Sequence, residues 1–302
     1  MNKKITAHLA LIATNIFFAI NFSAVKHLIN NNLIKPFGLN LIRAAVTTIL
    51  LWLLFLWKPT GNKIQRKDVL RFILCGLTGI AINQLLFLKG LSLTFSVHAS
   101  MLMLVTPIII TIAAAIILKE RLNQNKIAGL LFGVSGASIL IFSRTSHGNA
   151  TDVILGDFLV ILNAISYAFY FILVKPLMIN YNNVMIIRMI FTVGTFIILP
   201  FGWQEFREIP WQAYSGVDWF VLTLIVIAGT FFAYLFNVYG IKILGASIAG
   251  TYIYSQPFFA VVIAMIVLNE HLTLFEIIAS GLIFLGVYYS TKKISDQRNI
   301  KI

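Results

Sequence analysis

Long apolar segments alternate with short polar stretches along almost the whole chain. A helical segment of about 20 apolar residues crosses a hydrocarbon core about 30 Å thick. Ten segments approach or reach this length, namely residues 7–28, 38–57, 69–90, 97–118, 125–143, 155–178, 184–203, 217–240, 246–268 and 274–291. The pattern therefore predicts an all-α integral membrane protein with about ten transmembrane helices.

Landmark residues of the first half recur in the second half at a nearly constant spacing. Adding 150 to the numbers of Pro107 and Glu120 gives Pro257 and Glu270. The same shift relates Gly79 to Gly229, Gly90 to Gly240, Ala114 to Ala264, Ile127 to Ile277 and Gly136 to Gly286. We interpret the chain as two copies of one unit, residues 5–143 and 153–292, followed by a basic tail at 293–302. In a membrane protein, such a duplication indicates a transporter.

Composition indicates that lipid surrounds most of the chain. Hydrophobic residues make up 59% of the 302 residues and charged residues 11%, and the mean hydropathy is +0.91. A soluble domain with a hydrated surface does not have this composition. The formal net charge is +13, but the basic residues lie in short loops between apolar segments, so we expect no nucleic-acid partner. Cys75 is the single cysteine and can form no disulfide within the chain.

The basic residues are divided unequally between the two sides of the ten expected helices. One side has 17 of the 23 Lys and Arg residues, and the other six are Lys26, Lys35, Arg43, Lys89, Arg144 and Arg207. Cytoplasmic loops carry the excess of Lys and Arg, so we expect a multi-pass protein of the cell inner (plasma) membrane with both termini cytoplasmic. Five helices per unit is an odd number, so the second unit enters from the opposite face. The two units would then form inverted five-helix repeats.

Short motifs recur in the two halves of the chain. The first half contains Phe22–Lys26, Leu41–Arg43, Pro107, Glu120–Leu122 and the glycines 129, 133 and 136. The second half contains Ile172–Lys175, Ile187–Arg188, Pro257, Glu270 and Gly286. In these motifs each half resembles an EamA domain of the drug/metabolite transporter superfamily. The resemblance implies a secondary transporter that exports amino acids or similar small metabolites by alternating access. It implies neither enzymatic activity nor a cofactor.

Polar and aromatic residues inside the expected helices are the candidates for substrate binding. Carriers built from inverted repeats bind substrate near the bilayer midplane, between the repeats. Amides and phenols can form hydrogen bonds there without the cost of burying a charge. The candidates are Asn15, Asn21, Asn83, Gln84, Tyr167, Tyr170, Tyr234, Asn237, Tyr252 and Gln256. Alternatively, these side chains bond to neighbouring helices or lie at the membrane interface.

Two prolines and four basic residues are further candidates. Pro107 and Pro257 remove a backbone hydrogen bond inside a helix, so we expect a kink at each, either as a hinge or for packing alone. Lys26 with Arg43, and Lys175 with Arg188, occupy equivalent places near segment ends in the two units. These mouth charges would attract a carboxylate or phosphate, or reach lipid headgroups.

Motifs for other kinds of chemistry are missing from the sequence. There is no GxxxxGK[ST] loop and no HExxH, and the five histidines are scattered towards segment ends, so we expect no catalytic residues and no metal site. No Asp or Glu lies in the middle third of an expected helix, which argues against a buried proton relay.

Two alternatives to amino-acid export stay open at this stage. One is a carrier for anionic metabolites such as sugar phosphates or nucleotide derivatives, and the other is a membrane scaffold that transports nothing. The expected partners are a small-molecule substrate and the lipid bilayer. The small-residue face of Gly129, Gly133 and Gly136 suits close helix contact, within the chain or in a homodimer.

Overall fold

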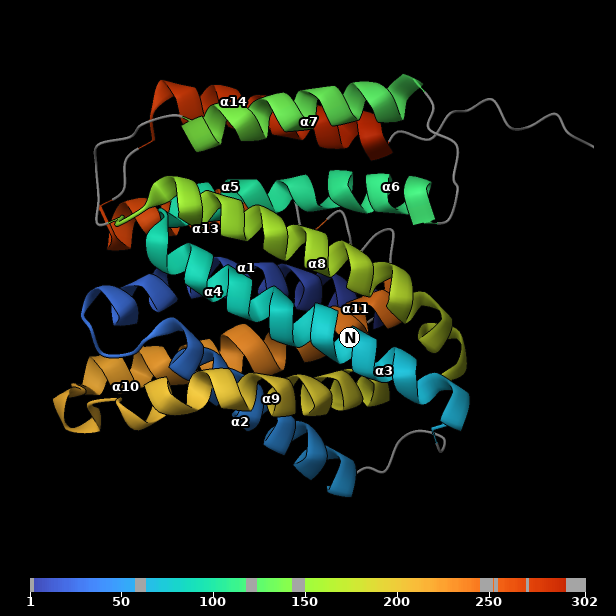
Figure 1. The fold of residues 1–302 in the computed structure, drawn as a ribbon, viewed down its shortest axis with the longest axis vertical. Helices are drawn as coiled ribbons and strands as arrows, with labels where there is room; N and C mark the ends of the chain where they lie inside the picture. Colours follow the sequence, from blue (N-terminus) through green and yellow to red (C-terminus); the bar gives the residue numbers. More distant parts are fainter. Residues whose placement is uncertain are drawn as a thin grey trace, which may run out of the picture.

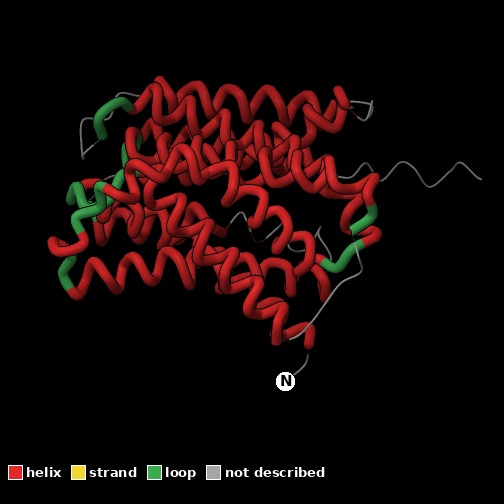
Figure 2. The backbone as a smooth tube through the Cα atoms, turned by 60° about the horizontal axis from the view of Figure 1, so that its bottom comes forward, coloured by secondary structure: helices red, strands yellow, loops and turns green. Residues whose placement is uncertain are grey.

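The computed structural model describes residues 3–57, 64–117, 124–142, 150–244, 252, 255–269 and 272–291. All regular secondary structure in these residues is helical. The helices run side by side, and most of their connections gather at two opposite ends of the bundle (Figure 2). The chain thus forms the all-α fold that the apolar segments predict.

The helices follow the chain in the order of the expected segments. The first half contains α1 (Lys3–Asn30), α2 (Pro36–Trp57), α3 (Val69–Gly76), α4 (Ile82–Leu93), α5 (Ser96–Leu102), α6 (Thr106–Ile117) and α7 (Gln124–Phe142). The second half contains α8 (Val153–Asn180), α9 (Asn183–Arg207), α10 (Gly216–Thr223), α11 (Ala233–Leu244), α13 (Gln256–Val267) and α14 (Leu274–Thr291). Short 3₁₀ turns lie at Arg66–Asp68, Met103–Val105 and Trp211–Ala213. Two π-helical segments join α3 to α4 and α10 to α11.

Six helices are long and apolar enough to cross a membrane: Lys3–Asn30, Pro36–Trp57, Arg66–Leu93, Val153–Asn180, Asn183–Arg207 and Gly216–Leu244. Four shorter apolar helices in the described residues are Ser96–Ile110, Ile127–Ile139, Phe258–Val267 and Leu274–Gly286. Each of the ten falls on one predicted segment, which confirms the predicted membrane fold. Part of the ninth segment and the expected basic tail lie outside the described residues.

Helix pairing follows the internal repeat. At one edge of the bundle α7 packs on α14, and at the opposite edge α2 packs on α9 (Figure 1). Between these edges α1 packs on α11 and α13, while its counterpart α8 packs on α4 and α6. Exchange of the two halves of the chain converts the contacts of α1 into those of α8, and it leaves the α7–α14 and α2–α9 pairs unchanged. This pairing is the arrangement expected of two inverted five-helix repeats.

Apolar side chains cover the outside of the bundle, and polar side chains are buried within it. Trp57, Ile179 and Phe196 are 90%, 84% and 72% exposed, whereas Asn40 and Thr47 of α2 are fully buried. Exposure of these apolar side chains to water would cost free energy, whereas exposure to lipid does not. Lipid instead requires that polar groups find their partners inside the protein. The distribution of side chains is therefore that of a membrane protein.

Glycines allow α7 and α14 to approach closely. A Cβ atom at Gly136 would lie 2.6 Å from the carbonyl oxygen of Ala279, and one at Gly286 would lie 2.6 Å from the backbone nitrogen of Gly133. These contacts involve backbone atoms, so no side-chain rotation could relieve them. The small-residue face of α7 is thus used for packing within the chain. A homodimer would need a different surface.

Candidate substrate site

Two π-helical segments interrupt equivalent helices of the two repeats. Leu77–Ala81 lies between α3 and α4, and Leu224–Phe232 lies between α10 and α11. The first contains Gly79 and the second Gly229, a pair related by the internal repeat. A π segment disturbs the regular backbone hydrogen bonding of a helix and often lies at a functional site. Hydrophobic periodicity does not reveal such segments, although the paired glycines are visible in the sequence.

Each of these glycines accommodates a side chain from the other repeat. A Cβ atom at Gly79 would lie 2.5 Å from the ring of Tyr170, and one at Gly229 would lie 3.1 Å from the amide of Asn21. Tyr170 of α8 and Asn21 of α1 are themselves equivalent, since a shift of 149 relates them, as it relates Lys26 to Lys175. Two predicted site residues therefore occupy symmetric places where the repeats meet.

Arg43 and Thr230 connect α2 to the second π segment. Arg43 Nε donates a hydrogen bond to Thr230 Oγ1 at 3.0 Å, and Thr230 Oγ1 donates to the carbonyl of Ile225 at 2.9 Å. Arg43 is 4% exposed, and its Nη1 atom has no hydrogen-bond partner among the described residues. Thr230 is the fifteenth of the 29 residues in Gly216–Leu244, so the guanidinium lies near the middle of this membrane-spanning helix.

The depth of Arg43 differs from the mouth position that the sequence suggested. Arg43 lies about two turns inside α2, and its side chain extends to the middle of a helix from the other repeat. Distance from a segment end does not reveal which part of a neighbouring helix a long side chain reaches. The structure therefore places Arg43 among the candidate substrate residues.

Gln84 and three tyrosines surround the same part of the bundle. Gln84 Nε2 donates to the hydroxyl of Tyr234 at 3.3 Å, and Gln84 Oε1 is buried without a described partner. The rings of Tyr167 and Tyr170 have centroids 5.5 Å apart. All three tyrosines are partly exposed. We call Arg43, Gln84, Tyr167, Tyr170, Thr230 and Tyr234 the central cluster.

Several other candidates bond to neighbouring backbone or side chains. Asn83 Nδ2 donates to the carbonyl of Asn163 at 3.3 Å, and Asn163 Nδ2 donates to the carbonyl of Asn83 at 2.6 Å. Asn15 donates to a carbonyl one turn earlier in α1, at 2.8 Å. The hydroxyl of Tyr252 lies 2.6 Å from Nδ1 of His8. These contacts favour structural roles for Asn15 and Asn83, whereas Asn237 and Gln256 are partly exposed.

The two arginines that the repeat relates have different surroundings. Arg188 is 4% exposed, and its guanidinium carbon lies 3.6 Å from the ring centroid of Phe55 and 4.7 Å from that of Trp52. Aromatic faces attract a cation, so these rings partly compensate for its burial. Lys26 is 1% exposed, so it too lies inside the bundle. The side chain of Lys175 lies outside the described residues.

The predicted kinks fall at changes of helix type. The 3₁₀ turn Met103–Val105 separates α5 from α6, and Pro107 is the second residue of α6. Pro257 is likewise the second residue of α13. The side chains of both prolines lie outside the described residues, and their role as hinges stays a prediction.

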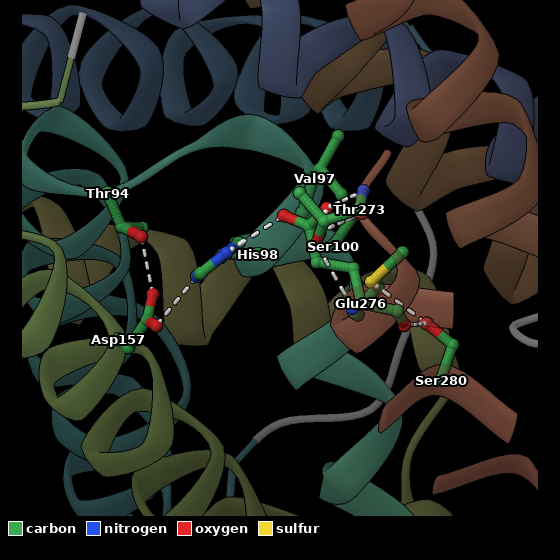
Figure 3. Close-up of polar contacts among 9 residues, drawn as sticks. Thr94, Val97, His98, Ser100, Asp157, Thr273, Glu276 and Ser280 are labelled. Carbon is green, nitrogen blue, oxygen red and sulfur yellow. Dashed lines mark hydrogen bonds and ion pairs between the residues drawn. The ribbon is translucent and has the colours of Figure 1, made fainter. Parts of the chain in front are cut away.

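A buried charged triad ties three helices together away from the central cluster. His98 Nδ1 of α5 lies 2.9 Å from Asp157 Oδ2 of α8, and His98 Nε2 lies 3.0 Å from Glu276 Oε1 of α14 (Figure 3). The contact with Glu276 is an ion pair by distance but is not aligned as a hydrogen bond. Thr94 donates to Asp157, and Thr273 donates to Glu276 through its backbone nitrogen and its hydroxyl.

All three members of the triad are almost completely shielded. The side chains of His98 and Asp157 are 0% exposed, and that of Glu276 is 3% exposed. In α8, Asp157 precedes Tyr167 by ten residues, or about 15 Å of helix axis. The expectation of isolated histidines is wrong for His98, because residues distant in sequence meet only after the helices pack. Within the described residues, no group of His, Cys, Asp and Glu has the arrangement of a metal site.

Comparison with known proteins identifies related chains. A model of the EamA-like transporter family matches residues 5–142 and 154–292. An uncharacterized transporter of Archaeoglobus fulgidus is 26% identical over 288 residues, which cover 94% of this chain and 98% of the relative. A protein of Streptantibioticus cattleyicolor described as a "probable terminal-alkyne amino-acid exporter" is 27% identical over 192 residues, covering 63% of this chain and 62% of the relative.

A solved crystal structure has the same fold. It matches this chain with a TM-score of 0.58 and 18% sequence identity, covering 92% of this chain and 96% of the other. At this level of identity the similarity concerns the arrangement of helices alone.

We predict that His98→Leu lowers the free energy of unfolding by about 3–5 kcal/mol, because it leaves two buried carboxylates without their common partner. Unfolding of the detergent-solubilised protein, followed by circular dichroism, measures this loss. His27→Leu is the matched control, since the pair of His27 with Asp218 has a side-chain exposure of 33% at the histidine and should contribute about 0–1 kcal/mol. Equal losses in the two variants would contradict a structural role specific to the buried triad.

Proposed function

Because the chain belongs to the EamA-like transporter family, we propose that it is a secondary transporter that exports amino acids or similar small metabolites by alternating access. Family membership makes it a multi-pass membrane transporter, and the substrate class is the part that we propose. The relative described as an amino-acid exporter supports this class. We assign no catalytic residue and no cofactor.

The position of the central cluster between the two repeats carries this proposal. Arg43 and Gln84 come from the first repeat, and Tyr167, Tyr170 and Tyr234 come from the second. Both repeats contribute a helix interrupted by a π segment at this level. Interrupted helices at the repeat interface are typical of carrier substrate sites. Rocking of one repeat against the other would expose this cluster to each side of the membrane in turn.

The charge of the central cluster favours amino acids over phosphorylated metabolites. Arg43 is the one cation in this cluster, so it matches a single carboxylate. A phosphate monoester carries a charge of about −1.5 to −2 at neutral pH and would need further positive charge in a lipid-surrounded site. Carriage of sugar phosphates or nucleotide derivatives is therefore the second candidate.

We propose that the protein lies in the cell inner (plasma) membrane with both termini in the cytoplasm. The unequal division of Lys and Arg between the two sides supports this orientation. The lipid bilayer and a small-molecule substrate are then its partners, and a homodimer is compatible with the helix packing if it uses a surface other than that of Gly136.

Counterflow in proteoliposomes tests the transport function. Vesicles loaded with one unlabelled compound are diluted into the same compound carrying a radiolabel, over a panel of leucine, phenylalanine, threonine, lysine, glutamate, glucose 6-phosphate and UMP. We expect transient accumulation of label for at least one amino acid, because exchange requires only a site that opens alternately to both sides. Tyr170→Ala should reduce this accumulation, whereas Phe196→Ala, on a side chain 72% exposed towards lipid, should not.

The outcome of this panel separates the candidate functions. Counterflow of the phosphorylated compounds alone would favour the anionic alternative. Failure of every compound to exchange, with protein verified in the vesicles, would contradict the proposed transporter of amino acids.

Thiol labelling in intact cells tests the orientation. In a Cys75→Ala background, a cysteine at Asn31 should react with an impermeant maleimide added outside. A cysteine at Gln65 should react only after the cells are permeabilised. Both positions are exposed and lie at the two ends of α2, before it begins and after it finishes. Equal reaction of both cysteines from outside, in cells that remain intact, would show that this orientation is wrong.

A further inference from the structure

Two polar atoms of the central cluster are buried without a hydrogen-bond partner among the described residues; one is a donor and the other an acceptor. Arg43 Nη1 is a hydrogen-bond donor on a permanently charged group, and Gln84 Oε1 is an acceptor. Each side chain is 4% exposed. His27, Lys35, Arg71 and His98 each form an ion pair with a described carboxylate, whereas Arg43 forms none with the described residues. Buried polar groups normally form hydrogen bonds, so a buried donor and a buried acceptor that both lack partners need an explanation.

We propose that Arg43 binds the carboxylate of the substrate and that Gln84 Oε1 accepts a hydrogen bond from its ammonium group. The substrates would then be zwitterions in which both groups are free, as in an amino acid. This assignment rests on the transporter function proposed above and adds the chemistry that selects the substrate.

Burial of the Arg43 guanidinium costs free energy unless a group of opposite charge lies beside it. A guanidinium has five N–H donors, and the described partner of Arg43 is one neutral hydroxyl, that of Thr230. Lipid surrounds the bundle, and none of the described carboxylates forms an ion pair with Arg43. The triad of His98 shows that this chain places carboxylates beside a buried basic side chain. A carboxylate supplied by the substrate would fill the same need at Arg43.

Arg188, the equivalent arginine of the second repeat, has neighbours that partly compensate for the burial of its charge. Arg188 is equally buried, and its Nε and Nη1 atoms also lack hydrogen-bond partners, but the rings of Trp52 and Phe55 lie against its guanidinium. No described interaction connects Arg188 to the central cluster. It has the same charge and an equivalent place in the repeat, which makes it a matched control for Arg43.

Arg43 and Gln84 approach the same face of one helix. Arg43 bonds Thr230 and Gln84 bonds Tyr234, and these two residues stand four positions apart in Gly216–Leu244. Residues four apart lie on one face, about one turn from each other. The donor from α2 and the acceptor from α4 can therefore reach opposite ends of one small molecule. The partly exposed rings of Tyr167 and Tyr170 offer a surface for its side chain.

In the described conformation both groups are closed off, so binding must accompany a change in the contact between the repeats. A carboxylate is a stronger acceptor for a guanidinium than a hydroxyl is, since it carries the opposite charge and can accept two parallel N–H bonds at once. Replacement of the Thr230 hydroxyl by a substrate carboxylate would loosen the contact between α2 and the second π segment. Recognition of the substrate and movement of the repeats would then involve the same hydrogen bond.

Competition in the counterflow assay tests this inference directly. The probe is the labelled amino acid that shows the largest counterflow in the panel. Its competitors are the same amino acid unlabelled, its carboxamide, which lacks the negative charge, and its N-acetyl derivative, which lacks the positive charge. We expect each derivative to compete about tenfold to a hundredfold less well than the amino acid, because each lacks one charge-assisted interaction.

Three variants assign the two preferences to their residues. Arg43→Gln should abolish the preference for the amino acid over its carboxamide and keep the preference over the N-acetyl derivative. Gln84→Leu should abolish the preference for the amino acid over its N-acetyl derivative and keep the preference over the carboxamide. Arg188→Gln should keep both preferences, because it removes an equivalent charge outside the central cluster.

Thermal unfolding distinguishes a substrate-binding role of Arg43 from a purely structural one. In the absence of substrate, Arg43→Gln should raise the unfolding temperature of the detergent-solubilised protein or leave it unchanged, since the variant removes an uncompensated buried charge. The amino acid should raise the unfolding temperature of the wild type but not that of Arg43→Gln. A lowered unfolding temperature together with unchanged substrate preferences would overturn the inference.

The wild type alone also decides the question if a variant does not fold. Equal competition by the amino acid, its carboxamide and its N-acetyl derivative would overturn the inference while leaving the transporter function intact. Absence of exchange for every amino acid in the panel would overturn both the inference and the proposed function.

Discussion

A polar group inside this protein must find its partner in the protein itself, in a substrate or in water that enters between the repeats, because lipid surrounds the bundle. This constraint explains most of the buried contacts between the repeats. Asn83 and Asn163 each satisfy the other's backbone carbonyl. Ser166 of α8 donates to the carbonyl of Thr78 in the first π segment, at 2.7 Å, and thereby joins α8 to this segment. Hydrogen bonds between helices thus hold the two repeats together where they are interrupted.

The same constraint separates structural from functional polar groups. The triad of His98, Asp157 and Glu276 is closed, since each charged side chain faces one of opposite sign or a hydrogen-bond donor. Arg43 Nη1 and Gln84 Oε1 are different, because each is buried with neither a hydrogen bond nor an ion pair among the described residues. Unpaired groups weaken a resting conformation, and a binding site needs groups that are free to bind. The central cluster therefore combines a cost in stability with the capacity to recognise a substrate.

Two physical regularities made the architecture predictable from sequence. Bilayer thickness fixes the length of an apolar helix, so ten segments could be recognised one by one. The duplicated landmarks, such as Pro107 with Pro257, then indicated which helices of the two halves correspond to each other. Much of the candidate site was also predictable, since Gln84, Tyr167, Tyr170 and Tyr234 are polar or aromatic residues inside apolar segments.

The rest of the site depends on contacts that no local pattern contains. Arg43 lies near a segment end in sequence, yet its side chain reaches Thr230 at the middle of another helix. His98 and Glu276 belong to different repeats and meet only when α5 packs near α14. The π segments arise from backbone hydrogen bonding and leave the apolar character of their helices unchanged. The chemistry of the centre is thus a property of the packed helices rather than of any one of them.

In the proposed transport cycle, the central cluster opens alternately to the two sides of the membrane. A cysteine at Tyr167, in a Cys75→Ala background, tests this with an impermeant thiol reagent in right-side-out and in inside-out vesicles. Alternating access predicts reaction in both preparations, and protection by the transported amino acid in each. Reaction from one side alone, or from neither side in a variant that still exchanges substrate, would contradict alternating access at this site.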